Sequence, residues 1–144
     1  MLTVSIGEMP SLLEAPGLAQ EAASLIVSEL AGQTPPDPTD VQLVLKAISG
    51  RTTIVAQNDT GRVLATGALK RKGHDRGLIE DVATASEHRR MGLGSGIIRV
   101  IEQIAKQRGL TQLAVYPTLS SEGFYTKLGY IDTGTAFFKC LELL

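Results

Sequence analysis

Residues 78–96, LIEDVATASEHRRMGLGSG, guide the interpretation of the whole chain. The apolar and β-branched residues from Leu78 to Thr84 predict a strand. From Ser95 to Gln107 the apolar residues recur with a helical period, which predicts an amphipathic helix; they are Ile97, Ile98, Ile101, Ile104 and Ala105. Two arginines and a glycine-rich run separate the two elements. A strand, a glycine loop and a helix N-terminus, in this order, are typical of an anion-binding site.

The physical basis of such a site is local. Glycines let the backbone turn tightly and approach a ligand, and the first N–H groups of a helix have no partner within it. Arg89 and Arg90 add full charges that suit phosphate oxygens. The loop lacks the Gly-Lys-Ser/Thr end of a Walker loop, and Ile97 stands where the dinucleotide fingerprint has its third glycine. A diphosphate fits the loop, and a glycine-rich turn that merely starts the helix is the alternative.

The rest of the chain predicts a mixed α and β domain. Thr39 and Gln42 have the spacing of a capping box, and Asn58 to Gly61 has the composition of a hairpin turn. In chain order we expect helices over 18–30 and 40–48, strands over 52–57 and 62–69, a basic loop over 70–76, a strand over 113–116, a short helix over 121–128, and one or two closing strands over 130–144.

Composition narrows the class of protein. The 144 residues, 43% hydrophobic and 20% charged, predict a single domain over 1–144. The net charge of -1 gives no reason to expect binding to nucleic acid or a membrane surface, and no apolar run is long enough for a membrane span. Met1 to Pro10 lacks the features of a signal peptide, and Cys140, expected in the core, cannot form a disulfide within the chain. We therefore expect a cytoplasmic protein.

Three motifs in order resemble the GCN5-related N-acetyltransferase (GNAT) superfamily. Arg89, Gly92 and Gly94 match its Q/R-x-x-G-x-G/A signature; residues 79–82, IEDV, stand where it has its central strand, and residues 123–130, GFYTKLGY, resemble its F-Y-x-K-x-G-F/Y segment. The resemblance covers residues 78–130. It implies the GNAT fold, an α/β (α+β) architecture in which a mixed, mostly antiparallel sheet is splayed in the middle and flanked by helices.

The resemblance also implies acetyl-CoA as cosubstrate, held between the strands at 78–84 and 113–116. The backbone of Val82, Ala83 and Thr84 would pair with the pantetheine arm, and the N–H of Val82 would polarise the thioester carbonyl. The diphosphate would be wrapped by Arg89, Arg90, Met91, Gly92, Leu93, Gly94 and Ser95. Ser121 and Phe124 are further predicted cofactor contacts, although Ser121 is also a candidate helix cap.

Glu80 is the first candidate for the base that deprotonates an amine, because the family often carries a carboxylate on this strand. Adjacent strand residues face opposite sides, so Glu80 and Asp81 cannot both point into one cleft unless a bulge intervenes. Either could instead be a solvated or salt-bridged strand residue. Tyr125 resembles the family tyrosine that donates a proton or a hydrogen bond to the departing sulfur, with anchoring or packing beside Phe124 as the alternatives.

Other ionisable groups give weaker signals. His74 and His88 are expected in loops, and two histidines with one cysteine offer no metal-ligand spacing, so no metal is expected. The basic residues within 70–76 could receive an anionic acceptor or form a solvated loop.

The predicted function is acetyl transfer from acetyl-CoA to the primary amine of a small molecule, by direct attack in a ternary complex. A partial resemblance to the glucosamine 6-phosphate N-acetyltransferase branch suggests an amino sugar phosphate. Protein or peptide amines, and a non-catalytic acyl-CoA-binding regulatory domain, are the alternatives. The resemblance makes a homodimer reasonable.

Overall fold

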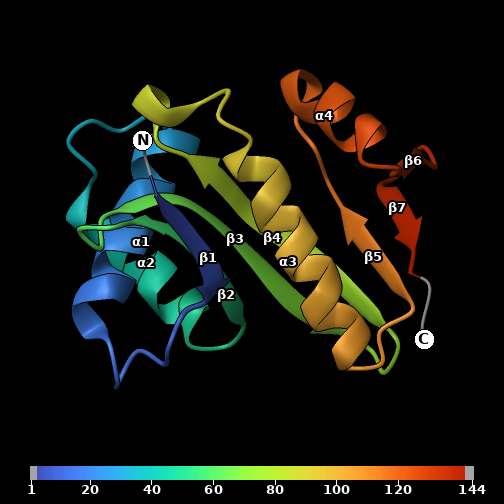
Figure 1. Cartoon of the computed structure of the whole chain (residues 1–144), viewed down its shortest axis with the longest axis horizontal. Helices are drawn as coiled ribbons and strands as arrows, with labels where there is room; N and C mark the ends of the chain where they lie inside the picture. The colour runs from blue at the N-terminus through green and yellow to red at the C-terminus, as the bar shows by residue number, and fades with distance from the viewer. Residues whose placement is uncertain (1–2, 142–144) are drawn as a thin grey trace.

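Seven strands form one mixed sheet in the computed structural model, which describes residues 3–141 (Figure 1). The spatial order of the strands is β1-β2-β3-β4-β5-β7-β6. Their bounds are β1 Val4–Glu8, β2 Thr52–Asn58, β3 Val63–Lys72, β4 Arg76–Thr84, β5 Gln112–Val115, β6 Ile131–Asp132 and β7 Phe137–Cys140. Strands β4 and β5 pair in parallel and the other neighbours pair antiparallel. The mostly antiparallel sheet expected from the sequence is confirmed.

Helices cover both faces of this sheet. They are α1 Pro16–Leu30, α2 Pro38–Ile48, α3 Leu93–Gln107 and α4 Glu122–Lys127, with short 3-10 turns η1 at Ser86–His88 and η2 at Leu119–Ser121. The isoleucine face of α3 packs in one core cluster with residues of β2, β3 and β4, whereas α1 and α2 form a second cluster with Met9, Val55 and Val63. Figure 1 shows α3 across the near face and α1 and α2 behind the sheet.

The structure corrects several boundaries expected from the sequence. Strand β1 was not predicted; it pairs with β2 at the sheet edge. The basic segment 70–76 is mostly strand, because β3 runs on to Lys72 and β4 starts at Arg76, so the turn between them is short. Helix α2 is capped by Asp37, whose carboxylate accepts the N–H groups of Thr39 and Asp40, rather than by Thr39.

The C-terminal segment contains two short strands. Cys140 ends β7 and is exposed, which corrects the expectation that it lies in the core. Phe137, three residues earlier, is the buried residue of this strand. Residues 142–144 of the predicted closing segment lie outside the described residues. Within residues 3–141, no helix combines the length and apolar character that crossing a membrane requires.

The sheet opens between β4 and β5. The two strands pair only from Arg76 with Gln112 to Ile79 with Val115, and β4 then continues alone to Thr84 on that side. On its other edge β4 carries a bulge, because Ala68 pairs with Glu80 but Thr66 pairs with Ala83. Gly67 stands opposite this bulge, and a Cβ at Gly67 would collide with the side chain of Ile97 in α3. The bulge therefore forms where only a glycine leaves room for the helix.

Candidate active site

A cavity of about 770 Å³ lies where β4 and β5 separate. Strand β4 forms one wall and the segment after β5 forms the other, while α1, α4 and the glycine loop each contribute residues. The lining residues are Glu29, Leu30, Leu78, Ile79, Glu80, Asp81, Val82, Ala83, Thr84, Arg89, Gly94, Val115, Tyr116, Pro117, Thr118, Ser120, Ser121, Phe124 and Tyr125. Segments from both ends of the chain thus meet at one opening in the sheet.

Most of the site residues predicted from the sequence meet in this cavity. Both catalytic candidates line it, as do the predicted cofactor contacts Val82, Ala83, Thr84, Arg89, Gly94, Ser121 and Phe124. The remaining loop residues do not line it: Arg90 and Met91 are exposed, and the Leu93 side chain packs in the core. The side chain of Ser121 donates to the carbonyl of Thr118 and makes no helix-capping hydrogen bond.

The glycine loop has the backbone geometry that an anion site needs. Arg90 and Gly92 both have positive φ, +68° and +77°. Gly92 precedes α3, and no side chain caps the helix N-terminus. The first N–H groups of α3 are therefore available to a ligand. Gly94 allows Phe124 of α4 to pack close, since a Cβ there would lie 3.3 Å from the Phe124 ring.

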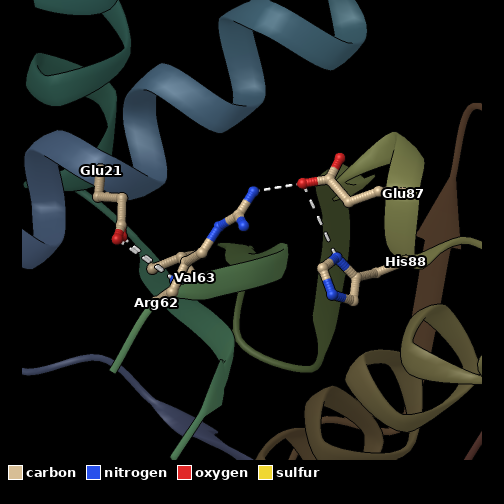
Figure 2. Close-up of polar contacts among 5 residues, drawn as sticks. All are labelled: Glu21, Arg62, Val63, Glu87 and His88. Atoms are coloured by element: carbon tan, nitrogen blue, oxygen red, sulfur yellow. Dashed lines mark hydrogen bonds and ion pairs between the residues drawn. The ribbon is translucent and has the colours of Figure 1, made fainter. Parts of the chain in front are cut away.

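The turn that precedes the loop is fixed to neighbouring elements (Figure 2). Arg62, just before β3, forms an ion pair with Glu87 of η1, and His88 Nδ1 lies 3.9 Å from the same Glu87 oxygen. Backbone hydrogen bonding, with a further contribution from Arg62, lowers the pKa of the exposed Glu87 carboxyl below its usual value. On the adjacent helix α1, Glu21 accepts the backbone N–H of Val63. The entry to the loop is thus tied to β3 and, through β3, to α1.

The loop is also tied directly to α1 by an ion pair that the sequence did not predict. Arg89 Nη2 lies 2.8 Å from Glu29 Oε1, and both residues line the cavity. The arginine side chain is more than half exposed, whereas the Glu29 side chain is largely covered. The predicted phosphate-binding arginine therefore already has an acidic partner at the cavity mouth.

Glu80 and Asp81 both line the cavity, because the bulge breaks the alternation of β4. Asp81 has a φ of +50°, an unusual backbone conformation for a residue other than glycine. Arg51, just before β2, lies against both carboxylates: its Nη1 is 3.4 Å from Glu80 Oε1 and its Nη2 is 2.6 Å from Asp81 Oδ2. The Arg51 side chain is buried, and each carboxylate is about one-third exposed. Sequence reasoning named both acids but missed the arginine.

Tyr125 both packs and lines the cavity. Its ring meets those of Phe124 and Tyr130 edge to face, with centroids 4.9 and 5.7 Å apart. Burial raises the pKa of Tyr125 to about 12. Its hydroxyl therefore stays protonated at physiological pH and can donate a hydrogen bond or a proton.

The family model for the acetyltransferase (GNAT) family matches residues 22–130, which hold most of this geometry. The chain belongs to the acetyltransferase (GNAT) family.

Two curated proteins are similar to about half of the chain. The Bacillus subtilis (strain 168) protein YyaT is 36% identical over 76 residues, 53% of this GNAT chain and 51% of YyaT. Glucosamine 6-phosphate N-acetyltransferase 1 of Oryza sativa subsp. japonica is 34% identical over 79 residues, 51% of this chain and 48% of the rice protein. The chain thus spans about half the length of the curated relatives it matches.

The fold extends beyond the region of sequence similarity. A crystal structure of aminoglycoside 6'-N-acetyltransferase complexed with coenzyme A superposes with a TM-score of 0.80 at 14% identity, over 97% of this chain and 98% of that one. The GNAT fold expected from the sequence motifs is confirmed over nearly the whole chain.

One weaker candidate lies outside the cavity of this GNAT domain. The basic residues within 70–76 sit at the end of β3 and the start of β4, and no residue from Arg71 to Arg76 lines the cavity. Arg71 donates instead to the backbone carbonyls of His74 and Arg108, which favours a structural hairpin end over an acceptor site. Across residues 3–141, no group of three or more His, Cys, Asp or Glu side chains is placed to hold a metal ion.

Proposed function

We propose that this chain is an N-acetyltransferase that moves the acetyl group of acetyl-CoA to the primary amine of a small molecule. The observation that carries the proposal is the cavity between β4 and β5, which brings the glycine loop, two carboxylates and a protonated tyrosine to one opening. Membership of the acetyltransferase family supports the same reaction.

The donor side of the cavity suits a long, extended ligand with a diphosphate. The C-terminal half of β4 pairs with β3 along one edge, whereas its other edge has no strand partner beyond Ile79 among the described residues. Val82, Ala83 and Thr84 lie on this free edge and can pair with the amides of a pantetheine arm as an added strand would. The arm would then lead toward the N-terminus of α3, where the loop backbone and Arg89 would hold the diphosphate.

Two side chains of the cavity, those of Glu80 and Tyr125, would carry out the proton transfers. An alkylammonium ion has a pKa near 10, so it must lose a proton before its nitrogen can attack. Glu80 would take that proton, the nitrogen would bond to the acetyl carbon, and the carbon–sulfur bond would break in one ternary complex. Tyr125 would supply a proton to the departing sulfur, and the second proton released from the nitrogen would return through solvent to Tyr125. The net products are the amide, CoA thiol and one proton.

The acceptor itself is proposed as a small amine. The rice relative named for glucosamine 6-phosphate supports an amino sugar phosphate. The cavity lining supports that acceptor less well, because Arg89 is the single Arg or Lys among the lining residues and it already contacts Glu29. Protein amines remain the second candidate, and a homodimer and a cytoplasmic location remain predictions.

The test is release of CoA thiol from acetyl-CoA over a panel of glucosamine 6-phosphate, spermidine, amino acids and a lysine-containing peptide. We expect turnover with at least one acceptor, reduced about 100-fold or more in Glu80→Gln and less in Tyr125→Phe. Acetyl-CoA binding without release on the whole panel would favour the non-catalytic alternative. Absence of binding would refute the proposed donor.

A further inference from the structure

A buried arginine lies beside the two carboxylates of the cavity. We propose that Arg51 is a positioning residue: it holds Asp81 as a fixed partner and keeps Glu80 turned toward the acceptor amine. This inference rests on the proposed function, since it assigns Arg51 a part in the proton transfer to Glu80. It also separates the roles of two neighbouring acids that the sequence could not distinguish.

The contacts of Arg51 are unequal. Its Nη2 atom is 2.6 Å from Asp81 Oδ2, whereas its Nη1 atom is 3.4 Å from Glu80 Oε1. Asp81 is also the bulge residue with a φ of +50°. The short Nη2 contact therefore holds Asp81 in its unusual backbone conformation. The longer Nη1 contact leaves the Glu80 carboxylate free to accept a proton. A planar guanidinium suits this arrangement, because its two terminal nitrogens can each face a different carboxylate.

Burial of Arg51 increases the energetic importance of these two contacts. The side chain of Arg51 is 5% exposed. Its Nη2 contact with Asp81 is an ion pair without hydrogen-bond geometry, and its Nε has no hydrogen-bond partner within the described structure. The charge of the guanidinium is therefore offset chiefly by the two acids, and the cluster of three carries one net negative charge. Removing one partner of a buried charge cluster leaves the others uncompensated, which costs far more than losing a surface ion pair.

Other charged groups lie near the cluster of Arg51, Glu80 and Asp81, and one of them provides a control variant. Glu29, paired with Arg89, and Tyr125 also line the cavity. Arg51 itself lines two smaller clefts, one with Arg71 and Arg108 and the other with Glu8. Arg108 pairs with Glu8 and contacts no residue of the carboxylate pair in the described hydrogen bonds. Its removal deletes a nearby positive charge while leaving Arg51, Glu80 and Asp81 in place.

The experiment measures kcat and KM separately for acetyl transfer, with the best acceptor among spermidine, glucosamine 6-phosphate and lysine, in four variants. Arg51→Met should lower kcat about 10- to 100-fold and leave the KM for the acceptor within about twofold, because Glu80 loses the contact that turns it toward the amine. The double variant Arg51→Met with Asp81→Asn should recover part of that loss, since it restores one net negative charge and leaves no unpaired carboxylate at position 81. Arg51→Lys should lie between wild type and Arg51→Met, and Arg108→Met should match wild type. The KM for acetyl-CoA should stay within about twofold throughout.

A folded Arg51→Met protein with the wild-type kcat, or a double variant that recovers none of the loss, would overturn the inference. If Arg51→Met does not fold, Arg51→Lys decides: an unchanged kcat would show that the arginine fork has no part in the reaction. No turnover by the wild-type chain with any of the three acceptors, in spite of acetyl-CoA binding, would refute the proposed function and this inference with it. Turnover with an unaltered kcat in the Arg51 variants would refute the inference alone.

Discussion

Glu80 and Asp81 are consecutive residues of one strand, yet their carboxylates face the same guanidinium, that of Arg51. In a regular strand their side chains would point to opposite faces of the sheet. The bulge opposite Gly67 turns Asp81 to the side of Glu80, and Val82 then packs toward α3. The irregularity of β4 thus builds the acidic end of the cavity and leaves the backbone edge beyond it free.

Gly67→Ala should destabilise the protein by about 1–3 kcal/mol, the usual cost of overpacking a core. The added methyl group would collide with Ile97, which is fully buried in α3. Urea unfolding measures the change. Gly17→Ala, at the start of α1, is the matched control, because a methyl group there would have no neighbour within 4 Å, and it should be neutral or slightly stabilising. Equal stability of the two variants would show that the bulge does not depend on close approach of α3.

Gly92→Ala should weaken acetyl-CoA binding about tenfold, measured by calorimetry. The residue has a φ of +77°, so a side chain strains the loop whose backbone N–H groups would hold the diphosphate. Gly73→Ala introduces a similar strain, at φ +79°, in the β3–β4 turn outside the cavity. The control should lose about as much stability as Gly92→Ala and keep wild-type affinity. A comparable loss of affinity in both variants would point to a general effect of instability.

Glu29→Gln should raise the affinity for acetyl-CoA about two- to fivefold at low salt. Glu29 holds Arg89 at 2.8 Å, and a neutral side chain would leave the arginine charge available to the diphosphate. The effect should shrink as salt is added, because an exposed arginine is screened. Glu14→Gln is the control, since its exposed carboxylate contacts Ser11 in the described structure. Weaker binding in Glu29→Gln would mean that the ion pair orients Arg89 for the ligand.

The wild-type protein should lose stability between pH 10 and 12. Burial raises the pKa of Tyr125 to about 12, above the value of about 10 in an unfolded chain. The stabilisation is complete below pH 10, because both states are then protonated, and it is lost as pH rises toward 12 and the unfolded state releases its proton first. Tyr125→Phe should show a smaller loss, measured by urea unfolding at each pH. Tyr116→Phe, at an exposed tyrosine, should follow the wild-type curve.

The sequence alone predicted the parts of this protein that depend on local chemistry. The isoleucine period of α3 and the glycines before it were readable because helical spacing and positive φ are properties of short segments. The spacing of the three motifs placed Glu80 and Tyr125 on elements that do line the cavity. The same local reasoning could state that Glu80 and Asp81 share a face only if a bulge intervenes, but it could not say whether one does.

The tertiary structure decided the rest. The bulge lies opposite Gly67 of the neighbouring strand, where α3 approaches the sheet, and neither Gly67 nor α3 is close to Asp81 in the sequence. Arg51 is 29 residues from Glu80, and Glu29 is 60 residues from Arg89. Separations this long belong to no helix or strand periodicity, so the sequence could not predict either ion pair. These ion pairs form when separate segments pack against one sheet and bring their charged side chains close together. The sequence therefore determined which elements form and which loop could hold an anion, whereas packing across the sheet determined which charges stand beside the acids in the cavity.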